Sequence, residues 1–283
     1  MLSLVLKQHI ESLLNASIIS QNILSGGDIN DVYLIETEHE KLVLKVNVAD
    51  RFPGMFEAEK VGLRLLSNTK TFVIPKLKAV GSDQNTAFLI LEYIQPDENA
   101  SNFSTGLGIN LARLHQHHSN YFGLDIDNYI GSLPQYNNKK DTAADFYVEQ
   151  RLIPQFKLAK ENGYSFDHLE RFYANIIDEI PNEPASLIHG DLWNGNFLIA
   201  SDGMACLIDP AVCFASREMD IAMMHLFGGF SQTVFDSYNE NYALPPAWKD
   251  RVAIWQLYYL LVHLNLFGRS YYHQVNTVIK RYS

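Results

Sequence analysis

The sequence predicts an α+β protein with two lobes, a small β-rich N-terminal lobe (1–96) and a larger, mainly helical C-terminal lobe (97–283). Three observations support this fold class. Short runs of alternating apolar residues, typical of strands, fill the first third of the chain. After Pro96 the apolar residues recur at helical spacing instead. A length of 283 residues with 47% hydrophobic and 19% charged residues suits one bilobed globular unit.

The expected N-terminal lobe begins with an amphipathic helix in MLSLVLKQHIESLLN, where Lys7, His9 and Glu11 interrupt the apolar residues. Three strands follow, QNIL, DVYLIET and KLVLKVN, joined by the turns SGGDIN and EHEK. A helix in MFEAEKVGLRLLS and two further strands, LKAVG and TAFLILEY, complete the lobe. Pro96 and the polar stretch DENASN then break the pattern, so we place the lobe boundary there.

The expected C-terminal lobe is helical apart from one segment. Helices are predicted near 103–118, 142–162, 165–180, 216–227 and 246–268. Between the third and fourth, SLIHGDLWNGNFLIASDGMACLIDP is typical of a short strand, a polar loop and a hairpin, FLIA and MACLID joined by an SDG turn.

Charge, hydropathy and cysteine content indicate which binding partners and which cellular compartment to expect. A formal net charge of −10 disfavours nucleic acid. The N-terminus has no basic leader, and no apolar stretch approaches the ~18 residues that a membrane span needs. Two cysteines, Cys206 and Cys213, are too few for a disulfide framework, so we expect buried thiols in a soluble cytoplasmic protein.

The most specific motif is HGDLWNGN at 189–196, followed by CLIDP at 206–210. Asp191 and Asn196 have the spacing of the kinase catalytic loop H-R-D-x-x-x-x-N, with Gly190 in place of arginine. In phosphoryl transfer such an aspartate receives the proton of the acceptor hydroxyl, while the asparagine binds Mg²⁺. The following hairpin would return Asp209 to the site as the second Mg²⁺ ligand. Each residue alone could be a turn residue, but His189 and these three together favour a kinase of the protein-kinase-like fold.

The first lobe offers the nucleotide contacts of such a kinase. Lys45, at the end of the strand LVLKVN, is expected to bind the phosphates of ATP. Its ion-pair partner is predicted to be Glu59, two turns into the next helix, and Glu57 is expected to be a surface acid. The remaining nucleotide-binding candidates are the glycines of SGGDIN and the backbone of LILEYIQP facing adenine: Gly26, Gly27, Glu92, Tyr93 and Ile94.

Over nearly its whole length the sequence resembles the fructosamine (ketosamine) kinase family, a branch of the kinase-like fold related to aminoglycoside phosphotransferases. The resemblance is carried by GGDINDVY, LVLKVN, FEAEKVGLRLL, FGLDIDNYIGSLPQYN, DFYVEQRLIPQ, HGDLWNGN, IDPAV, SREMDIAMMHLFGGF and HLNLFGRSYY. It implies transfer of the γ-phosphate of ATP, with Mg²⁺, to the 3-hydroxyl of a small-molecule or protein-bound ketosamine, a step in deglycation. It further implies that Asp220 supports the catalytic loop through backbone N–H groups, with His189 also a supporting residue.

For the acceptor site the candidates are Trp193, Phe227, Phe230 and His263. Two departures from the family pattern concern Asp28, where some members have a cysteine that supports redox-sensitive dimers, and KKDTAADFY, which lacks a tryptophan that the family often has. Because Asp28 replaces the cysteine, a disulfide switch at this loop is not expected. Without the tryptophan, the family pattern does not define the fine shape of the acceptor pocket. A monomer or weak dimer is expected.

Three alternatives were weighed. His115, His117 and His118 could indicate a metal hydrolase, but they lie at an expected helix end without the ligand spacing of a zinc site. A pseudokinase is disfavoured because no residue of the catalytic set is missing. Another kinase of small hydroxyl compounds, acting on an aminoglycoside, choline or homoserine, is the closest competitor.

Overall fold

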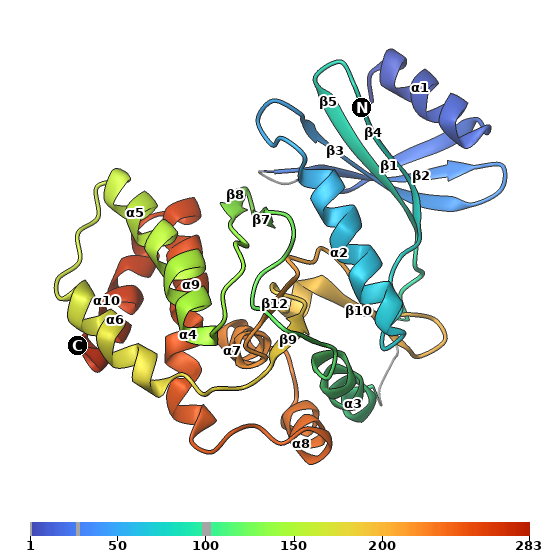
Figure 1. Ribbon diagram of the computed structural model, residues 1–283. Helices are drawn as coiled ribbons and strands as arrows, with labels where there is room; N and C mark the ends of the chain where they lie inside the picture. The colour runs from blue at the N-terminus through green and yellow to red at the C-terminus, as the bar shows by residue number, and fades with distance from the viewer. Residues whose placement is uncertain (1, 27–28, 98–102) are drawn as a thin grey trace.

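The computed structural model describes residues 2–26, 29–97 and 103–283, and it confirms the α+β, two-lobed architecture (Figure 1). The first lobe is a five-stranded sheet in the order β1-β2-β3-β5-β4, with every neighbouring pair antiparallel. Its strands are β1 (Ile18–Gly26), β2 (Asp31–Thr37), β3 (Lys41–Val48), β4 (Leu77–Asp83) and β5 (Thr86–Glu92).

Two helices pack against this sheet. Helix α1 (Leu4–Leu14) buries Leu6 and Ile10 in an apolar cluster with the sheet, because these two residues lie on one face of the helix. Helix α2 (Met55–Thr69) lies between the sheet and the second lobe in Figure 1.

A second apolar cluster joins the two lobes. Phe56 and Leu63 of α2 belong to the same buried cluster as Leu107 and Leu111 of α3 (Ser104–His115). Since this core is continuous, burial alone does not mark the boundary between the lobes. The boundary predicted between residues 96 and 97 lies in the connection from β5 to α3, and it stays a prediction.

The second lobe is built mainly from helices around a third cluster, centred on the long helix α9. The helices are α4 (Ala143–Phe146), η1 (Tyr147–Leu152), α5 (Ile153–Glu161), α6 (Leu169–Glu179), α7 (Glu218–Phe227), α8 (Gln232–Asn241), α9 (Trp248–Phe267), η3 (Arg269–Tyr271) and α10 (Tyr272–Tyr282). In the described part of the chain none of them is both long and apolar enough to cross a membrane.

Several expected helices differ in detail. The helix expected at 142–162 is interrupted by the π-helical turn η1, a feature often found at functional sites. The helix expected from 165 begins only at Leu169, because His168 has a left-handed φ of 62°. Helices α8 and α10 were not predicted, and both are mostly polar segments whose few buried residues pack against other helices.

Short strands carry the central loops. The predicted hairpin is present as β10 (Phe197–Ile199) and β11 (Ala205–Leu207), with a short 3-10 turn, η2 (Asn194–Asn196), before it. Strand β9 (Ala185–Ile188) pairs with β6 (His118–Ser119) and β12 (Cys213–Ala215). A further hairpin, β7 (Asn128–Ile130) and β8 (Leu133–Gln135), lies between α2 and α9 in Figure 1. Strands β6, β7, β8 and β12 were not predicted, because two or three residues are too few to show an alternating pattern. Strands β10 and β11 are as short, but the SDG turn between them indicated the hairpin.

Candidate active site

Asp191 and Asn196 lie on the loop between β9 and β10 and contact each other directly. The side-chain amide of Asn196 donates to Asp191 Oδ2 at 3.0 Å and to the backbone oxygen of Asp191 at 2.8 Å. Burial raises the pKa of Asp191 to about 7, with the charges of Asp209 and Asp220 adding to the rise and the Asn196 hydrogen bond opposing it. The loop therefore holds a carboxylate that can accept a proton near neutral pH.

Asp220, in the first turn of α7, holds the start of this loop. Its carboxylate accepts the backbone N–H of His189 at 2.8 Å and that of Gly190 at 2.9 Å. Burial raises the pKa of Asp220, but the hydrogen bond from His115 and these N–H groups outweigh burial and lower it. Asp220 is thus an ionised, buried anchor for the residues that precede Asp191.

His189 connects the loop to the segment that follows β11. Its Nε2–H donates to the backbone oxygen of Ile208 at 3.0 Å, and its own backbone oxygen accepts the N–H of Ala211 at 2.9 Å. Its Nδ1 accepts the backbone N–H of Asp191 at 3.3 Å, which requires a neutral ring, and burial favours that form because it lowers the pKa of His189. The bonds to Ile208 and Ala211 thus connect the loop of Asp191 to residues on both sides of Asp209.

The structure gives a steric reason for glycine where protein kinases have arginine. Gly190 has a left-handed φ of 83°, and a Cβ built on it would lie 2.1 Å from the backbone oxygen of Ala211. Its backbone oxygen also accepts the hydroxyl of Tyr259 at 3.1 Å. No side chain fits at this position unless the loop moves.

Gly190→Ala is therefore expected to displace the catalytic loop. We expect kcat for the phosphoryl transfer that the sequence predicts to fall at least ~tenfold, with a loss of about 1–3 kcal/mol of unfolding free energy from overpacking. The control is Gly203→Ala in the β10–β11 turn, which has a φ of 81° but no atom within 4 Å of the added Cβ. Steady-state kinetics and urea unfolding of both variants test this, and a wild-type kcat in Gly190→Ala would contradict it.

Lys45 joins two carboxylates beneath the sheet. Its Nζ lies 2.6 Å from Glu59 Oε1 and forms a second ion pair with Asp209. Burial by itself lowers the pKa of Lys45, but Asp209 and Glu59 outweigh it and raise the pKa, so the amine stays protonated. Glu57 instead pairs with Lys60 on the surface.

Two details differ from the sequence-based expectation. Lys45 lies inside β3 rather than at its end, because pairing with β5 continues to Val48. Glu59 lies about one turn into α2, not two, because the helix begins at Met55.

Asp209 and Asn196 line a polar cavity of about 230 Å³ together with Lys45 and Glu59. Asp209 has a left-handed φ of 52°, unusual for a residue with a side chain, and its side chain is 48% exposed. Because the amide nitrogen of Asn196 donates to Asp191, its amide oxygen is the atom available to coordinate a ligand. One carboxylate and one amide oxygen on a shared cavity are donors that fit Mg²⁺.

The other residues expected to bind the nucleotide are two glycines near the phosphates and a backbone segment facing adenine. Gly26 ends β1 opposite Asp31, and Gly27 lies outside the described residues, so the approach of these glycines to phosphate stays a prediction. Glu92 ends β5, and its N–H donates to the backbone oxygen of Lys76 at 2.9 Å. Glu92, Tyr93 and Ile94 line a separate cavity that shares no residue with the polar one. Contact of their backbone with adenine stays a prediction.

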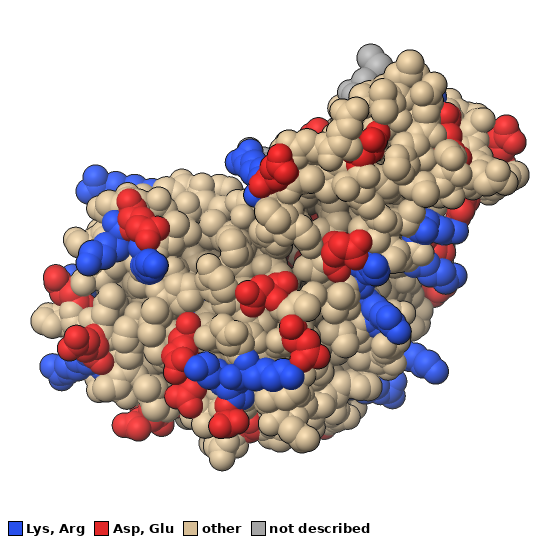
Figure 2. All heavy atoms as spheres, turned by 45° about the horizontal axis from the view of Figure 1, so that its top comes forward, with Lys and Arg blue, Asp and Glu red and all other residues tan. Residues whose placement is uncertain are grey.

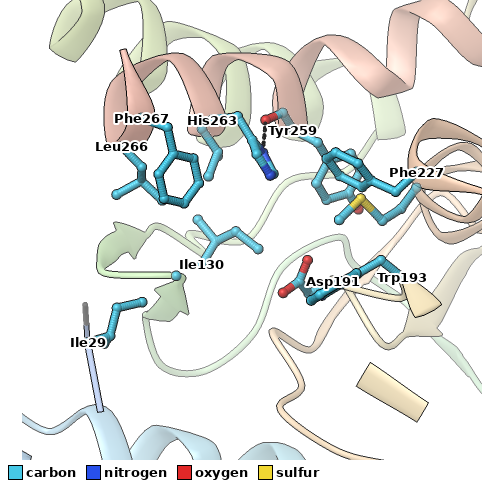
Figure 3. A pocket seen from close by; sticks show the side chains of 12 residues that line it. Ile29, Ile130, Asp191, Trp193, Phe227, Tyr259, His263, Leu266 and Phe267 are labelled. Atoms are coloured by element: carbon cyan, nitrogen blue, oxygen red, sulfur yellow. Dashed lines mark hydrogen bonds between the residues drawn. The ribbon is translucent and has the colours of Figure 1, made fainter. Parts of the chain in front are cut away.

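A second cavity of about 230 Å³, mostly apolar, lies against Asp191 (Figure 3). Trp193, Phe227 and His263 line it, as the sequence analysis predicted for an acceptor site. Phe230 does not line it, because its ring stacks on Phe197 at 5.2 Å between ring centroids. The lining residues that the sequence analysis missed include Ile130, Tyr259, Val262, Leu266 and Phe267. Four of these lie on α9 within the motif HLNLFGRSYY or just before it, at the spacing of one helix face, which was an available signal.

A buried polar network, also missed, fixes the segment after Asp209. Asn128 and Gln135, at the base of the β7–β8 hairpin, donate to the backbone oxygens of Val212 and Ala211 at 2.9 and 3.0 Å. The Tyr258 hydroxyl donates to Gln135 Oε1 at 2.8 Å. Asn137 and Arg151 extend the network, and Arg151 lies in the π-helical turn. The only sequence signal was that these residues fall in the family motifs FGLDIDNYIGSLPQYN and DFYVEQRLIPQ.

His115 belongs to the support of Asp220 rather than to a zinc site. Its ring is fully buried, with Nε2 3.2 Å from Asp220 Oδ2 and Nδ1 2.9 Å from the Tyr238 hydroxyl. His118 contacts the Tyr242 hydroxyl. Within residues 2–26, 29–97 and 103–283, no three His, Cys, Asp or Glu residues are grouped as a metal site.

Burial lowers the pKa of His115, so its neutral form should make stability depend on pH. Because the unfolded chain binds this proton near pH 6.5 and the folded one only at lower pH, stability is retained above pH 6.5 and falls as the pH drops further. Asp220, Arg217 and Glu183 also act on the ring and stay in place in the variant His115→Gln.

We expect this variant to lose stability less steeply between pH 7 and 5, by up to ~1.4 kcal/mol per pH unit. Urea unfolding at a series of pH values measures the slope, and His273→Gln on the exposed surface is the control. A slope equal to that of the wild type would refute the assignment of a neutral His115.

Charged residues outside the site are mixed in sign. On the face shown in Figure 2, acidic and basic side chains are interspersed. Among the described residues that line the polar cavity, Lys45 is the one basic side chain, and it is buried.

Comparison with known proteins agrees with this geometry. Residues 1–283 match the sequence model of a family described as fructosamine kinase. A probable ketoamine kinase of Enterococcus faecium is 39% identical over 264 residues, which cover 91% of this chain and 93% of the relative. The crystal structure of a candidate fructosamine-3-kinase from Haemophilus somnus superposes with a TM-score of 0.89 at 29% identity, covering 98% of this chain and 96% of that one.

The fold extends to a more distant group. An aminoglycoside phosphotransferase crystallised with ADP and hygromycin B superposes with a TM-score of 0.62 at 13% identity, covering 97% of both chains. At this identity the likeness shows the kinase-like fold alone.

Proposed function

Because the chain belongs to the fructosamine kinase family, and is therefore a phosphotransferase that uses a hydroxyl group as acceptor, we propose that it transfers the γ-phosphoryl group of ATP to the 3-hydroxyl of a ketosamine. The observation that carries the proposal is the position of Asp191. This carboxylate lines both the polar cavity and the apolar one, so a hydroxyl beside it has phosphate-binding residues on one side and an acceptor pocket on the other.

In the proposed reaction Asp191 orients the acceptor hydroxyl and takes its proton as the oxygen attacks the γ-phosphorus. Lys45 neutralises charge on the phosphates while Glu59 keeps the amine in place. Asn196 and Asp209 would hold Mg²⁺, which supplies further positive charge to the phosphate oxygens when bound. ATP use is supported by the distant structural neighbour that binds ADP.

Lys45 has two acidic partners in the structure, Glu59 and Asp209. We infer that a phosphate oxygen of bound ATP takes the place of Asp209 as the second partner. Asp209, whose side chain is already half exposed, then becomes available as a metal ligand. A cytoplasmic role in deglycation is part of the proposal, and the two buried free cysteines are compatible with it.

The proposal is tested by measuring ADP formation with Mg²⁺ and a panel of acceptors. The panel contains a fructosyl-amine, a ribulosyl-amine, an aminoglycoside, choline and homoserine, and the phosphorylated carbon is identified by NMR. Turnover on a ketosamine with phosphate at carbon 3 is the expected result. Turnover confined to another acceptor would replace the substrate class. Binding of Mg-ATP, seen as a raised melting temperature, without turnover on any of them would overturn the proposed activity.

A further inference from the structure

We infer that the apolar cavity beside Asp191 binds the amine-side substituent of the ketosamine, so that adducts of hydrocarbon amines are preferred over adducts that carry a carboxylate near the nitrogen. The inference rests on the proposed function and adds to it the chemistry of the group on the nitrogen. It is carried by the lining of the cavity shown in Figure 3.

The side chains that form the walls are almost entirely apolar. Helix α9 contributes one wall, the tip of the β7–β8 hairpin faces it, and the catalytic loop and the end of α7 close the side (Figure 3). The hydrocarbon and aromatic side chains of the lining are Ile29, Ile130, Trp193, Met223, Phe227, Val262, Leu266 and Phe267. A ligand group that displaces water here gains from burial of apolar area.

Three large aromatic residues are exposed at this one place. Trp193 is 41% exposed, Phe227 is 42% and Phe267 is 57%, and all three line the same cavity. Scattered apolar side chains on a surface need no explanation, but exposed rings gathered around a cavity beside a catalytic residue indicate a ligand site. Their π faces would also stabilise the protonated secondary amine of a ketosamine.

The polar groups of the cavity are few and mostly occupied. The Tyr259 hydroxyl donates to the backbone oxygen of Gly190, and His263 Nδ1–H donates to the backbone oxygen of Tyr259 at 2.8 Å. Asp191 and the remaining nitrogen of His263 are acceptors. The lining contains no lysine or arginine, so the protein offers no cation to a carboxylate that is desolvated in it beside Asp191.

The sugar part of the ketosamine does not suit this cavity, because the cavity has few polar groups free to bind hydroxyls. A polyhydroxyl chain needs donors and acceptors for every buried hydroxyl, and each hydroxyl left unpaired weakens binding. With the 3-hydroxyl at Asp191, the amine side of the molecule therefore lies among the apolar residues. The remaining hydroxyls then lie towards Asn30, a polar residue of the neighbouring cavity that the proposed phosphoryl transfer does not use.

The test uses one ketose joined to four amines: n-butylamine, benzylamine, ethanolamine and glycine. We expect kcat/KM for the butyl and benzyl adducts to exceed that for the glycine adduct at least ~tenfold, with the ethanolamine adduct between them, and most of the difference in KM. Equal kcat/KM values, or a preference for glycine, would refute the inference and leave the proposed function intact. Failure to phosphorylate any of the four would refute the proposed function itself.

A charged residue introduced into the wall of the apolar cavity provides a second, independent test of the inference. Leu266→Lys places a cation on the α9 face of the cavity, and we expect it to lower kcat/KM for the butyl adduct while raising it for the glycine adduct. His273→Lys on the exposed surface of α10 adds the same charge away from the cavity and should keep the wild-type ranking. An unchanged ranking in Leu266→Lys would contradict the placement of the amine substituent.

Discussion

Asp191→Asn is expected to lower kcat by about 10²–10⁴-fold while the protein stays folded. Asparagine has the same shape, but it cannot accept the proton of the acceptor hydroxyl. Its amide can still pack beside Asn196, so the loop held by Asp220 should keep its position. Single-turnover kinetics with the best ketosamine measure the loss, and the melting temperature with and without Mg-ATP shows whether fold and nucleotide binding remain.

Asp178→Asn is the matched control for this substitution. Asp178 is an exposed aspartate on α6 and lines none of the three cavities described above. This variant should keep the wild-type kcat. If Asp191→Asn also retained wild-type turnover, another residue would have to act as the base, and the proposed mechanism would be wrong.

Lys45→Met is expected to remove both activity and a large part of the stability. Methionine cannot neutralise phosphate charge, and it leaves the Glu59 carboxylate buried without its cation. Breaking a buried ion pair in this way typically costs about 3–5 kcal/mol. Urea unfolding should show this loss, and kcat/KM should fall together with the binding of Mg-ATP.

The double variant Lys45→Met/Glu59→Leu separates the two effects. Removing the second charge should restore much of the unfolding free energy, because no unpaired carboxylate remains, but it should restore no activity. Lys78→Met is the surface control. Lys78 pairs with Glu40 at 2.6 Å, and the two side chains are 32% and 41% exposed. This substitution should lower the unfolding free energy by less than about 1 kcal/mol. Wild-type stability in Lys45→Met would show that the buried pair is not formed in solution.

The grouping of Asp191, Asn196 and Asp209 around one cavity could be predicted because its signals are local in sequence. Asp191 and Asn196 lie on one loop, and one hairpin returns Asp209 to them, so spacing alone determines that they meet. The choice of Glu59 over Glu57 as the partner of Lys45 was also correct, because residues two apart on a helix point in directions about 200° apart and only one of them can face Lys45.

Trp193, Phe227 and His263 of the apolar cavity were predicted to lie together, but the rest of its lining and the polar network could not be predicted in the same way. Their residues come from distant segments, and the contacts of Asn128 and Gln135 are with backbone oxygens, which leave no pattern in the sequence. Phe230 was expected in the acceptor site but does not line the apolar cavity. It lies in the distinctive motif FGGF, but whether an aromatic ring faces a cavity or a neighbouring ring depends on packing that the motif does not encode.

In the eight residues of the β7–β8 hairpin, from Asn128 to Gln135, substitutions at the tip and at the base should have different effects on function. Its base, through Asn128 and Gln135, is tied to the backbone that follows Asp209, whereas its tip, with Ile130 and Gly131, faces the apolar cavity. Substitutions at the tip can therefore alter which molecules are accepted without moving the phosphoryl-transfer residues. Substitutions at the base would alter the rate for every acceptor alike, so relatives with different substrate preferences should vary at the tip and keep the base.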